Sequence, residues 1–394
     1  MSKNFYPALL FISLVLCACN GKSVSYNSPE AETILYDPDS TETIRLDDVV
    51  QVTKVIELMS DSHAGMIGEI RELLYTNGVF VVFDSENKLV QTFDENGNFI
   101  RRISFLGNGP HEYLDIMDVC ITPSGNIAIL DIQKQRILEF TVDGKFVSSF
   151  PFDCMTGEIE YLNNDTVVFN VSCQCFNQDD RINNCQIFLA DRNRNGVGFW
   201  GEDLYFKTGN ATYGMTFDQI YRFGGSVLCT LLDNNIIYKL ADDGTMVPKY
   251  NLKLRPDDLV PIWDKDSHNS DDMANWFTTF FDNPYFGGSF IEFEDYTLVR
   301  YTKHYEYLPM LLYDHKKNQT FALDESGSDG MFSMFYNFSP AIMDDGHSVV
   351  CWVSPDVIRM YKEYGRIPNN ELFMEAIKDY TEESNPLLVV FTFK

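Results

Sequence analysis

The chain has 394 residues, 45% of them hydrophobic, and its formal net charge is −28. This apolar content supports a globular protein with a large core and excludes a chain that is disordered throughout. The acidic excess excludes nucleic acid as a partner, because binding to phosphate backbones depends on clustered Lys and Arg side chains.

The N-terminus has the pattern of a secretory signal peptide. Lys3 supplies a positive charge, residues 8–16 form an almost unbroken apolar run, and Leu16-Cys17-Ala18-Cys19 ends it. The run is shorter than the about 20 apolar residues of a membrane-spanning helix. Its end resembles the lipobox of bacterial lipoproteins, which predicts removal of residues 1–18 and lipidation of Cys19. An ordinary signal peptide with incidental cysteines is the alternative.

Lipid on Cys19 would tether the mature protein to a membrane, because each buried CH₂ group contributes about 0.8 kcal/mol. Residues 19–42 are small and polar and include Pro29 and Pro38, which predicts a flexible linker after the lipid. We therefore expect an envelope protein anchored by lipid, at the outer membrane, on a face that the sequence does not define.

Seven cysteines follow Cys19, so they cannot all pair with one another. Export would place them in a compartment where disulfides persist. Cys173 and Cys175 are separated from Cys185 by a polar loop, which favours one disulfide across a hairpin. A zinc site is disfavoured, because no fourth ligand stands at a matching spacing.

An internal repeat organises the body of the chain. Four landmark residues return 47 positions later, as the pairs Asp84 and Asp131, Phe93 and Phe140, Gly97 and Gly144, and Phe99 and Phe146. A third, shorter copy runs from Leu228 to Val247 and includes Gly244. The Asn-Gly and Asp-Gly pairs favour hairpin turns, so each repeat predicts a meander of antiparallel strands. A period of about 40–50 residues is typical of a propeller blade.

The recurring aspartates Asp84, Asp131 and Asp233 each end an apolar strand. We interpret each carboxylate as holding the turn that follows it, with a direct ligand role as the alternative.

Residues 43–394 predict an all-β, six-bladed propeller of four-stranded antiparallel blades, with seven blades as the alternative. The blades should begin near residues 65, 110, 155, 220, 285 and 335. The segment Thr43 to Val55 is left over, and we expect it to close the ring by completing the last blade.

Two insertions, about 255–288 and 354–384, interrupt the strand pattern. In the first, Ser270 predicts the start of a short helix whose aromatic face includes Trp276. That face would either pack on the propeller or form a platform for a ligand. In the second, Ser354 and Pro355 predict another helix start, and residues 370–381 a further helix.

Residues 105–113, Phe-Leu-Gly-Asn-Gly-Pro-His-Glu-Tyr, form a distinctive box. Together with the repeat and the final segment 383–394, the box resembles the six-bladed β-propeller lipoproteins of anaerobic bacteria, which are related to NHL-repeat proteins. The resemblance covers nearly all of the mature chain and implies this fold and an envelope location. A glycine usually stands where this chain has His111. No catalytic residues follow from the resemblance.

The sequence contains no motif of a serine hydrolase, zinc protease, phosphate-binding loop or EF-hand, and its six histidines are scattered. We therefore predict a non-enzymatic module that binds or scaffolds a glycan, peptide or protein, without a cofactor or metal. The alternative is a hydrolase or lyase at the mouth of the central channel, using acidic residues and a divalent cation. The candidate ligand-binding residues are His111, Glu112, Tyr113 and Trp276, which have no counterpart in the repeat.

Overall fold

The structure is a computed structural model. It describes residues 31–59, 65–171, 180–183, 185–201, 219–232, 234–260, 282–303, 306–324, 340–381 and 383–394. The predicted signal peptide, Cys19, Asp233 and Trp276 lie outside the described residues, as do Cys173 and Cys175.

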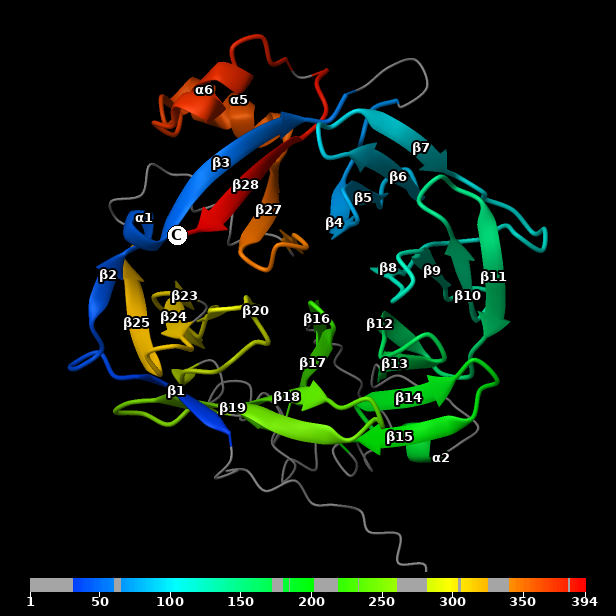
Figure 1. The fold of residues 1–394 in the computed structure, drawn as a ribbon, viewed down its shortest axis with the longest axis horizontal. Coiled ribbons are helices and arrows are strands. Elements are labelled where there is room, and N and C mark those ends of the chain that lie inside the picture. The colour runs from blue at the N-terminus through cyan, green and yellow to red at the C-terminus, as the bar shows by residue number, and fades with distance from the viewer. Residues whose placement is uncertain are drawn as a thin grey trace, which may run out of the picture.

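Six antiparallel sheets form a closed ring, which confirms the predicted six-bladed propeller (Figure 1). Blade A contains β4 (Ile70–Thr76), β5 (Val79–Asp84), β6 (Leu89–Asp94) and β7 (Phe99–Ile103). Blade B contains β8 (Asp118–Ile121), β9 (Ile127–Asp131), β10 (Arg136–Phe140) and β11 (Phe146–Pro151). Blade C contains β12 (Thr156–Tyr161), β13 (Thr166–Val171), β14 (Ile187–Asp191) and β15 (Gly196–Trp200), with α2 (Asp180–Asn183) between β13 and β14.

The second half of the ring follows the same plan. Blade D contains β16 (Ile220–Phe223), β17 (Ser226–Thr230), β18 (Ile236–Leu240) and β19 (Met246–Leu254). Blade E contains β20 (Phe290–Glu292), β21 (Tyr296–Val299), β24 (Leu311–Asp314) and β25 (Gln319–Asp324), with a hairpin of β22 (Thr302–Lys303) and β23 (Glu306–Tyr307). Blade F contains β26 (Ala341–Ile342), β27 (Ser348–Val353), β28 (Leu387–Phe393) and β3 (Val50–Glu57).

The middle strands of the blades are apolar on both faces because each blade packs against two neighbours. All five residues of β9 and all six of β27 are buried. Six clusters of buried hydrophobic side chains fill the six interfaces between neighbouring blades. Burial of this apolar surface is the main favourable contribution to folding.

An N-terminal strap, residues 32–57, runs along the outer rim of three blades (Figure 1). Its strands are β1 (Glu32–Tyr36), which pairs in parallel with β19, and β2 (Thr43–Arg45), which pairs in parallel with β25. After α1 (Leu46–Val49), strand β3 pairs antiparallel with β28 and completes blade F.

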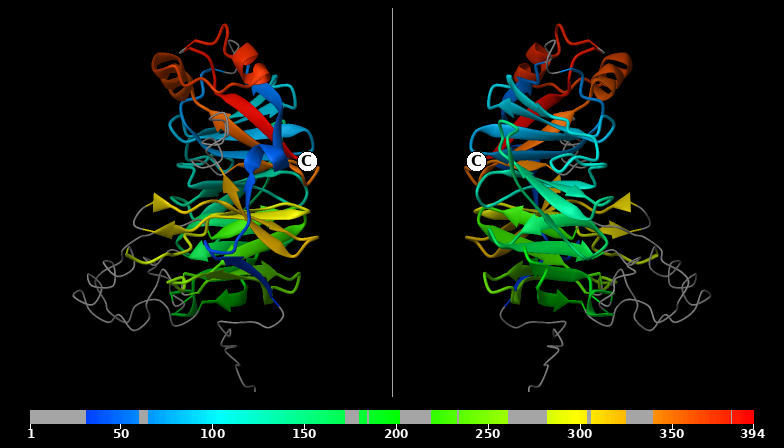
Figure 2. Two further views of the ribbon diagram at one scale, coloured as in Figure 1. Left: turned by 90° about the vertical axis from the view of Figure 1, so that its left-hand side faces the viewer. Right: turned by 90° about the vertical axis from the view of Figure 1, so that its right-hand side faces the viewer.

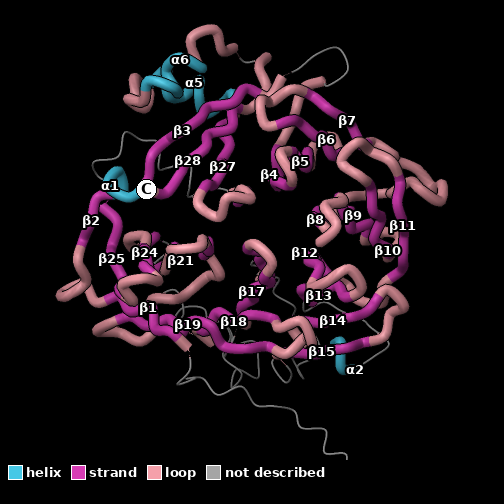
Figure 3. Tube along the Cα trace, viewed as in Figure 1, coloured by secondary structure: helices cyan, strands magenta, loops and turns pink. Residues whose placement is uncertain are grey.

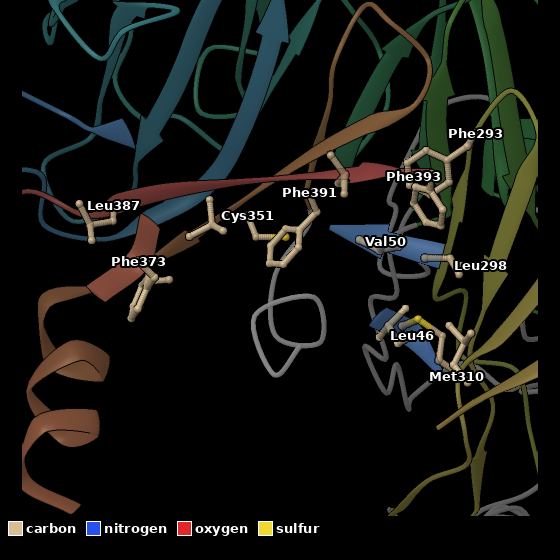
Figure 4. Packing of buried hydrophobic residues seen from close by; sticks show 14 of the residues in the cluster. Leu46, Val50, Phe293, Leu298, Met310, Cys351, Phe373, Leu387, Phe391 and Phe393 are labelled. Atoms are coloured by element: carbon tan, nitrogen blue, oxygen red, sulfur yellow. The ribbon is translucent and has the colours of Figure 1, made fainter. Parts of the chain in front are cut away.

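The strap differs in two ways from the expectation drawn from the sequence. The expected closing segment, Thr43 to Val55, is divided, because Leu46 is buried in the E–F interface and α1 turns the chain there. In addition, the stretch expected to be a linker contains β1, whose Ile34 is fully buried between blades D and E. In Figure 4, Leu46 and Val50 of the strap lie beside Leu298 and Met310 of blade E.

The glycines of the repeat occupy the turn between the third and fourth strands. Gly97, Gly144 and Gly244 have φ values of 82°, 78° and 80°, in the left-handed region that favours glycine. All three also lie against the preceding blade, and a Cβ atom on Gly244 would lie 3.1 Å from Cδ2 of Leu189. A Cβ atom on Gly97 would overlap the carbonyl oxygen of Glu57, and one on Gly144 would lie 2.8 Å from Cγ of Arg101. The repeat therefore preserves a contact between blades as well as a turn.

Two helices leave blade F between β27 and β28. Helix α5 (Pro355–Tyr364) begins at Ser354, whose hydroxyl accepts the N–H of Val357 at 3.4 Å. Helix α6 (Glu371–Ala376) begins at Asn370 and is anchored by buried Phe373. The predicted helix start at Ser354 is confirmed, whereas the second helix is shorter than predicted. The helices of the described chain lie at the rim of the ring (Figure 3).

Within the described residues, no helix is long and apolar enough to span a membrane.

Replacing Gly97 by Ala should destabilise the ring more than replacing Gly78 by Ala. Both glycines have nearly the same positive φ, 82° and 81°, so both variants lose about 1–2 kcal/mol to backbone strain. A Cβ on Gly78 meets nothing within 4 Å, whereas a Cβ on Gly97 overlaps the strap. We expect an additional loss of about 1–3 kcal/mol for Gly97→Ala, measured by urea denaturation. Equal losses in the two variants would show that this contact does not secure the closed ring.

Candidate functional site

The predicted box lies in the connection between β7 and β8. Glu112 folds the chain back on itself, because its Oε2 atom accepts the N–H of Gly109 at 2.7 Å. The backbone groups of Gly107 and Tyr113 are also paired, at 2.9 Å. A Cβ atom on Gly107 would overlap the Glu112 carboxylate, and one on Gly109 would lie 2.9 Å from its Cδ. The two glycines therefore make room for the carboxylate of the same loop.

Tyr113 is fully buried in the interface between blades A and B. Its hydroxyl lies 3.0 Å from the carbonyl oxygen of Lys88 and 3.1 Å from that of Ile103, which satisfies a polar group in an apolar core. Burial raises the pKa of Tyr113, so the hydroxyl remains a neutral donor. The side chain holds the loop on the ring.

Two basic side chains of blade B bind the carbonyl groups of the same loop. Lys134 Nζ donates to the carbonyl oxygens of Gly107 at 2.6 Å and of Glu112 at 2.9 Å. Arg136 donates to the carbonyl oxygens of Pro110 and Glu112. These cations fix the loop without requiring a ligand.

His111 is exposed, and its ring stacks on Phe146 of β11 with a centroid separation of 3.9 Å. The structure therefore places His111, Glu112 and Tyr113 in one loop. Of these three side chains, that of His111 is exposed. Their role in ligand binding, and that of Trp276, stays a prediction.

The repeated aspartates Asp84 and Asp131 have the predicted structural role. Asp84 accepts the N–H groups of Gly68 and Asn87 at 2.9 and 3.0 Å. Asp131 accepts those of Leu114 and Lys134 at 3.1 and 3.2 Å. Each carboxylate thus joins its own turn to the connection that enters the blade.

Carboxylates on the innermost strands, which the sequence did not reveal, link successive blades near the centre of the ring. Glu72 of blade A accepts the N–H of Val119 at 3.1 Å. Asp118 of blade B accepts the N–H of Ile159 at 2.6 Å. Glu158 of blade C accepts the N–H groups of Gln219 and Ile220, at 3.0 and 3.1 Å. In each case the acceptor belongs to one blade and the donor to the next or to its entry.

The inner carboxylates also interact with one another. Burial raises the pKa of Asp118 well above its ordinary value, and the negative charge of Glu72 and a hydrogen bond to it raise it further. Burial likewise raises the pKa of Glu160, although Arg222 Nε donates to it at 3.0 Å. Burial therefore disfavours the charged forms of both Asp118 and Glu160.

A different polar cluster joins blades B and C. Glu139 accepts hydrogen bonds from Tyr161 at 2.6 Å, from Ser148 at 2.7 Å and from Arg192 at 2.5 Å. Burial alone would raise the pKa of Glu139, but these three donors outweigh it and lower the pKa. This carboxylate is therefore ionised and paired, in contrast to Asp118.

In the described part of the chain, no group of three or more His, Cys, Asp and Glu side chains is placed to hold a metal ion. Cys120, Cys229 and Cys351 are buried thiols, and burial raises the pKa of each. Cys185 is buried, with its Sγ 3.5 Å from the carbonyl oxygen of Ile182. Because Cys173 and Cys175 lie outside the described residues, the predicted disulfide stays a prediction.

Opposite effects on stability are expected for Asp118→Asn and Glu139→Gln at pH 7. The raised pKa of Asp118 means that its favourable contribution is complete below about pH 3.9 and is lost as the pH rises. The amide oxygen introduced by Asp118→Asn still accepts the N–H of Ile159, and the amide places no charge in the core. The melting temperature of this variant should therefore be higher than that of the wild type at pH 7 and equal to it near pH 3.5. Glu139→Gln should lose about 1.5–3 kcal/mol at pH 7, and the loss should shrink as the pH falls below about 4.3.

Thermal unfolding between pH 3 and 8 measures both effects. A destabilised Asp118→Asn variant at pH 7 would contradict the raised pKa of the buried Asp118 carboxyl group.

The fold is shared with solved structures from Bacteroides. A Bacteroides fragilis protein that is described as exported superposes with a TM-score of 0.71 at 17% identity, over 92% of this chain and 99% of that one. A Bacteroides vulgatus member of the DUF4221 family superposes with a TM-score of 0.52 at 13% identity, over 88% and 99% of the two chains. No curated protein matches the sequence. A family model matches residues 33–392, and the chain therefore belongs to the family described as a domain of unknown function, DUF4934.

Proposed function

We propose that this protein is a non-enzymatic binding module of the cell envelope, and that helices α5 and α6 carry its partner surface. The observation behind the proposal is a group of exposed apolar side chains on this insertion. Their exposed fractions range from 38% to 68% in the set Met360, Tyr364, Ile367, Leu372 and Met374, which we call the insertion surface.

Apolar residues scattered singly over a protein surface need no explanation, whereas a local group of them favours an interaction site. The insertion surface occupies a short stretch of one blade. Elsewhere in the described chain, the helices α1 and α2 have four residues each, so no comparable insertion is described in another blade. The insertion of blade F can therefore serve a binding role without altering the strands of the ring.

The chemistry of the insertion surface favours a protein partner over a glycan. Four of its five residues are aliphatic or Met, and Tyr364 is the one aromatic ring among them. Flexible Met side chains adapt to apolar partner surfaces. We therefore propose a partner segment that carries apolar side chains.

The position of the insertion surface also favours a protein over the membrane. Figure 1 shows α5 and α6 on blade F, at the far end of the strap from β1, the first strand after the predicted lipid tether. Figure 2 shows the two helices at one end of the molecule. A protein tethered through residue 19 would present this end away from its anchor.

The inner-strand carboxylates support the binding proposal over a hydrolase or lyase. Oxygen atoms of Glu72, Asp118 and Glu158 accept backbone N–H groups from the following blade or its entry. Carboxylates used in this way stabilise the ring and are less available for chemistry on a substrate.

Envelope anchoring is the second part of the proposal, and it depends on Cys19. The description of the Bacteroides fragilis protein as exported supports it. We expect Cys19→Ser to move the protein from the membrane fraction to the aqueous fraction without changing its melting temperature, as measured by fractionation and metabolic labelling with a fatty acid. Lipid incorporation that persists in this variant would exclude Cys19 as the lipidated residue.

The insertion surface is tested by photocrosslinking in the full-length protein in its host cell. A photoreactive phenylalanine analogue at position 364 should form one discrete adduct with another protein, and adding Met360→Ser and Leu372→Ser should remove it. The control is the same analogue at Val197, which is 52% exposed on the rim of blade C and should give no adduct. Mass spectrometry identifies the partner. Equal adducts at both positions, no adduct, or an adduct with a second copy of this chain would each contradict the proposal.

A further inference from the structure

The interface between blades F and A, where β3 completes the ring, contains two buried amide side chains. Gln91 belongs to β6 of blade A, and Asn385 lies just before β28 of blade F. Gln91 is fully buried, and Asn385 is 1% exposed. Around them lies the hydrophobic cluster that includes Phe80 and Leu388, which we call the F–A cluster. Both amides are therefore placed in apolar surroundings.

Gln91 points into this interface. Val82 pairs with Gln91 across the ladder of β5 and β6, and Phe93 lies two positions further along β6. Side chains two positions apart on a strand project from the same face of a sheet, and so do those directly opposite on neighbouring strands. Because Val82 and Phe93 both belong to the F–A cluster, the amide of Gln91 faces blade F.

Asn385 reaches the same interface from blade F. Its Oδ1 atom accepts the N–H of Ile67, which lies at the entry to blade A, at 2.8 Å. A backbone N–H can only donate, so the amide oxygen of Asn385 must face Ile67 and the NH₂ group must point the other way. Ile67 itself belongs to the F–A cluster.

Three atoms of these two amides have no hydrogen-bond partner within the part of the chain that the structure describes. They are Oε1 and Nε2 of Gln91 and Nδ2 of Asn385, and all three are buried. Exchanging the oxygen and nitrogen of Gln91 corrects nothing, because neither position has a partner. A buried amide without hydrogen bonds strongly disfavours the folded state.

The unpaired atoms define the ligand that can satisfy them. The oxygen of Gln91 needs a hydrogen-bond donor, whereas the NH₂ groups of Gln91 and Asn385 need acceptors. A metal cation would satisfy only the oxygen, and an anion only the NH₂ groups. Water both donates and accepts, and in protein interiors it typically forms about three hydrogen bonds to such groups. We propose that the F–A interface binds buried water through the amides of Gln91 and Asn385.

The water site lies beside the sheet that closes the ring. Asn385 is two residues from the start of β28, the strand that pairs with β3. Hydrophobic contact between the blades is not directional, whereas a water molecule held by an amide requires a defined position of its partner groups. Bound water therefore adds directional hydrogen bonds to the interface that forms when the ring closes.

The test combines crystallography with thermal unfolding of the mature chain. A high-resolution map of the wild type should show ordered water within hydrogen-bond distance of the Gln91 amide. Gln91→Met has a similar volume and no amide, so its map should lack that water. Because this variant loses the hydrogen bonds between amide and water, its melting temperature should be about 2–4 °C lower than that of the wild type.

Gln186→Met is the matched control. Gln186 is 1% exposed, and its Oε1 accepts the N–H of Leu232 at 2.8 Å in the interface between blades C and D. This variant should also have a lower melting temperature, because it removes a hydrogen bond between protein groups. Its map should keep the water at Gln91.

Two results would overturn the proposal. One is a wild-type map without water at the Gln91 amide. The other is a Gln91→Met variant whose melting temperature equals or exceeds that of the wild type, as expected if the amide is buried without any hydrogen bond. If Gln91→Met does not fold, the wild-type map alone decides.

Discussion

Closure of the ring is the constraint on which the rest of the structure depends, because a propeller blade without its last strand leaves a row of unpaired backbone groups. In this protein β3 closes the ring by pairing along the whole of β28, from Val50 opposite Phe393 to Glu57 opposite Leu387. The last strand of the strap and the last strand of the chain are thereby held in one sheet. All six interfaces between blades are fixed once that sheet forms, so the strap determines whether the ring is complete.

Apolar and polar contacts between the blades make different contributions to the stability of the ring. The hydrophobic clusters supply most of the stabilisation, but apolar contact is not directional and would tolerate small shifts of one blade against the next. The carboxylates of Glu72, Asp118 and Glu158 each require a backbone donor of the neighbouring blade or its entry at hydrogen-bond distance. These directional hydrogen bonds near the centre therefore fix the rotation of each blade relative to the next. At the rim, the glycine turns that contact the preceding blade have the same effect.

The sequence reveals the parts of this fold that are encoded locally. Hairpin glycines, apolar runs and the repeat spacing are properties of short segments, so the six blades and the start of α5 could be predicted. Closure of the last blade by the segment that ends at Val55 was also predicted, and β3 provides it. The pairing of β1 and β2 with blades D and E and the inner carboxylates could not be predicted, because each depends on a partner far away in the chain, such as Ile34 opposite Leu252. The box around Glu112 was visible in the sequence, but its hydrogen bonds to Gly109 and Lys134 belong to the folded loop alone.

The insertion of α5 and α6 lies where the fold can best tolerate it. Strand β28 pairs with β27 over six residue pairs and with β3 over seven, so a long excursion between β27 and β28 is held at both ends by extended ladders. Phe373 and Ile377 pack into the core beneath the helices, which fixes the insertion on the ring instead of leaving it on a loop. The strap that closes the ring therefore also provides the rigid base for the exposed apolar side chains of this insertion.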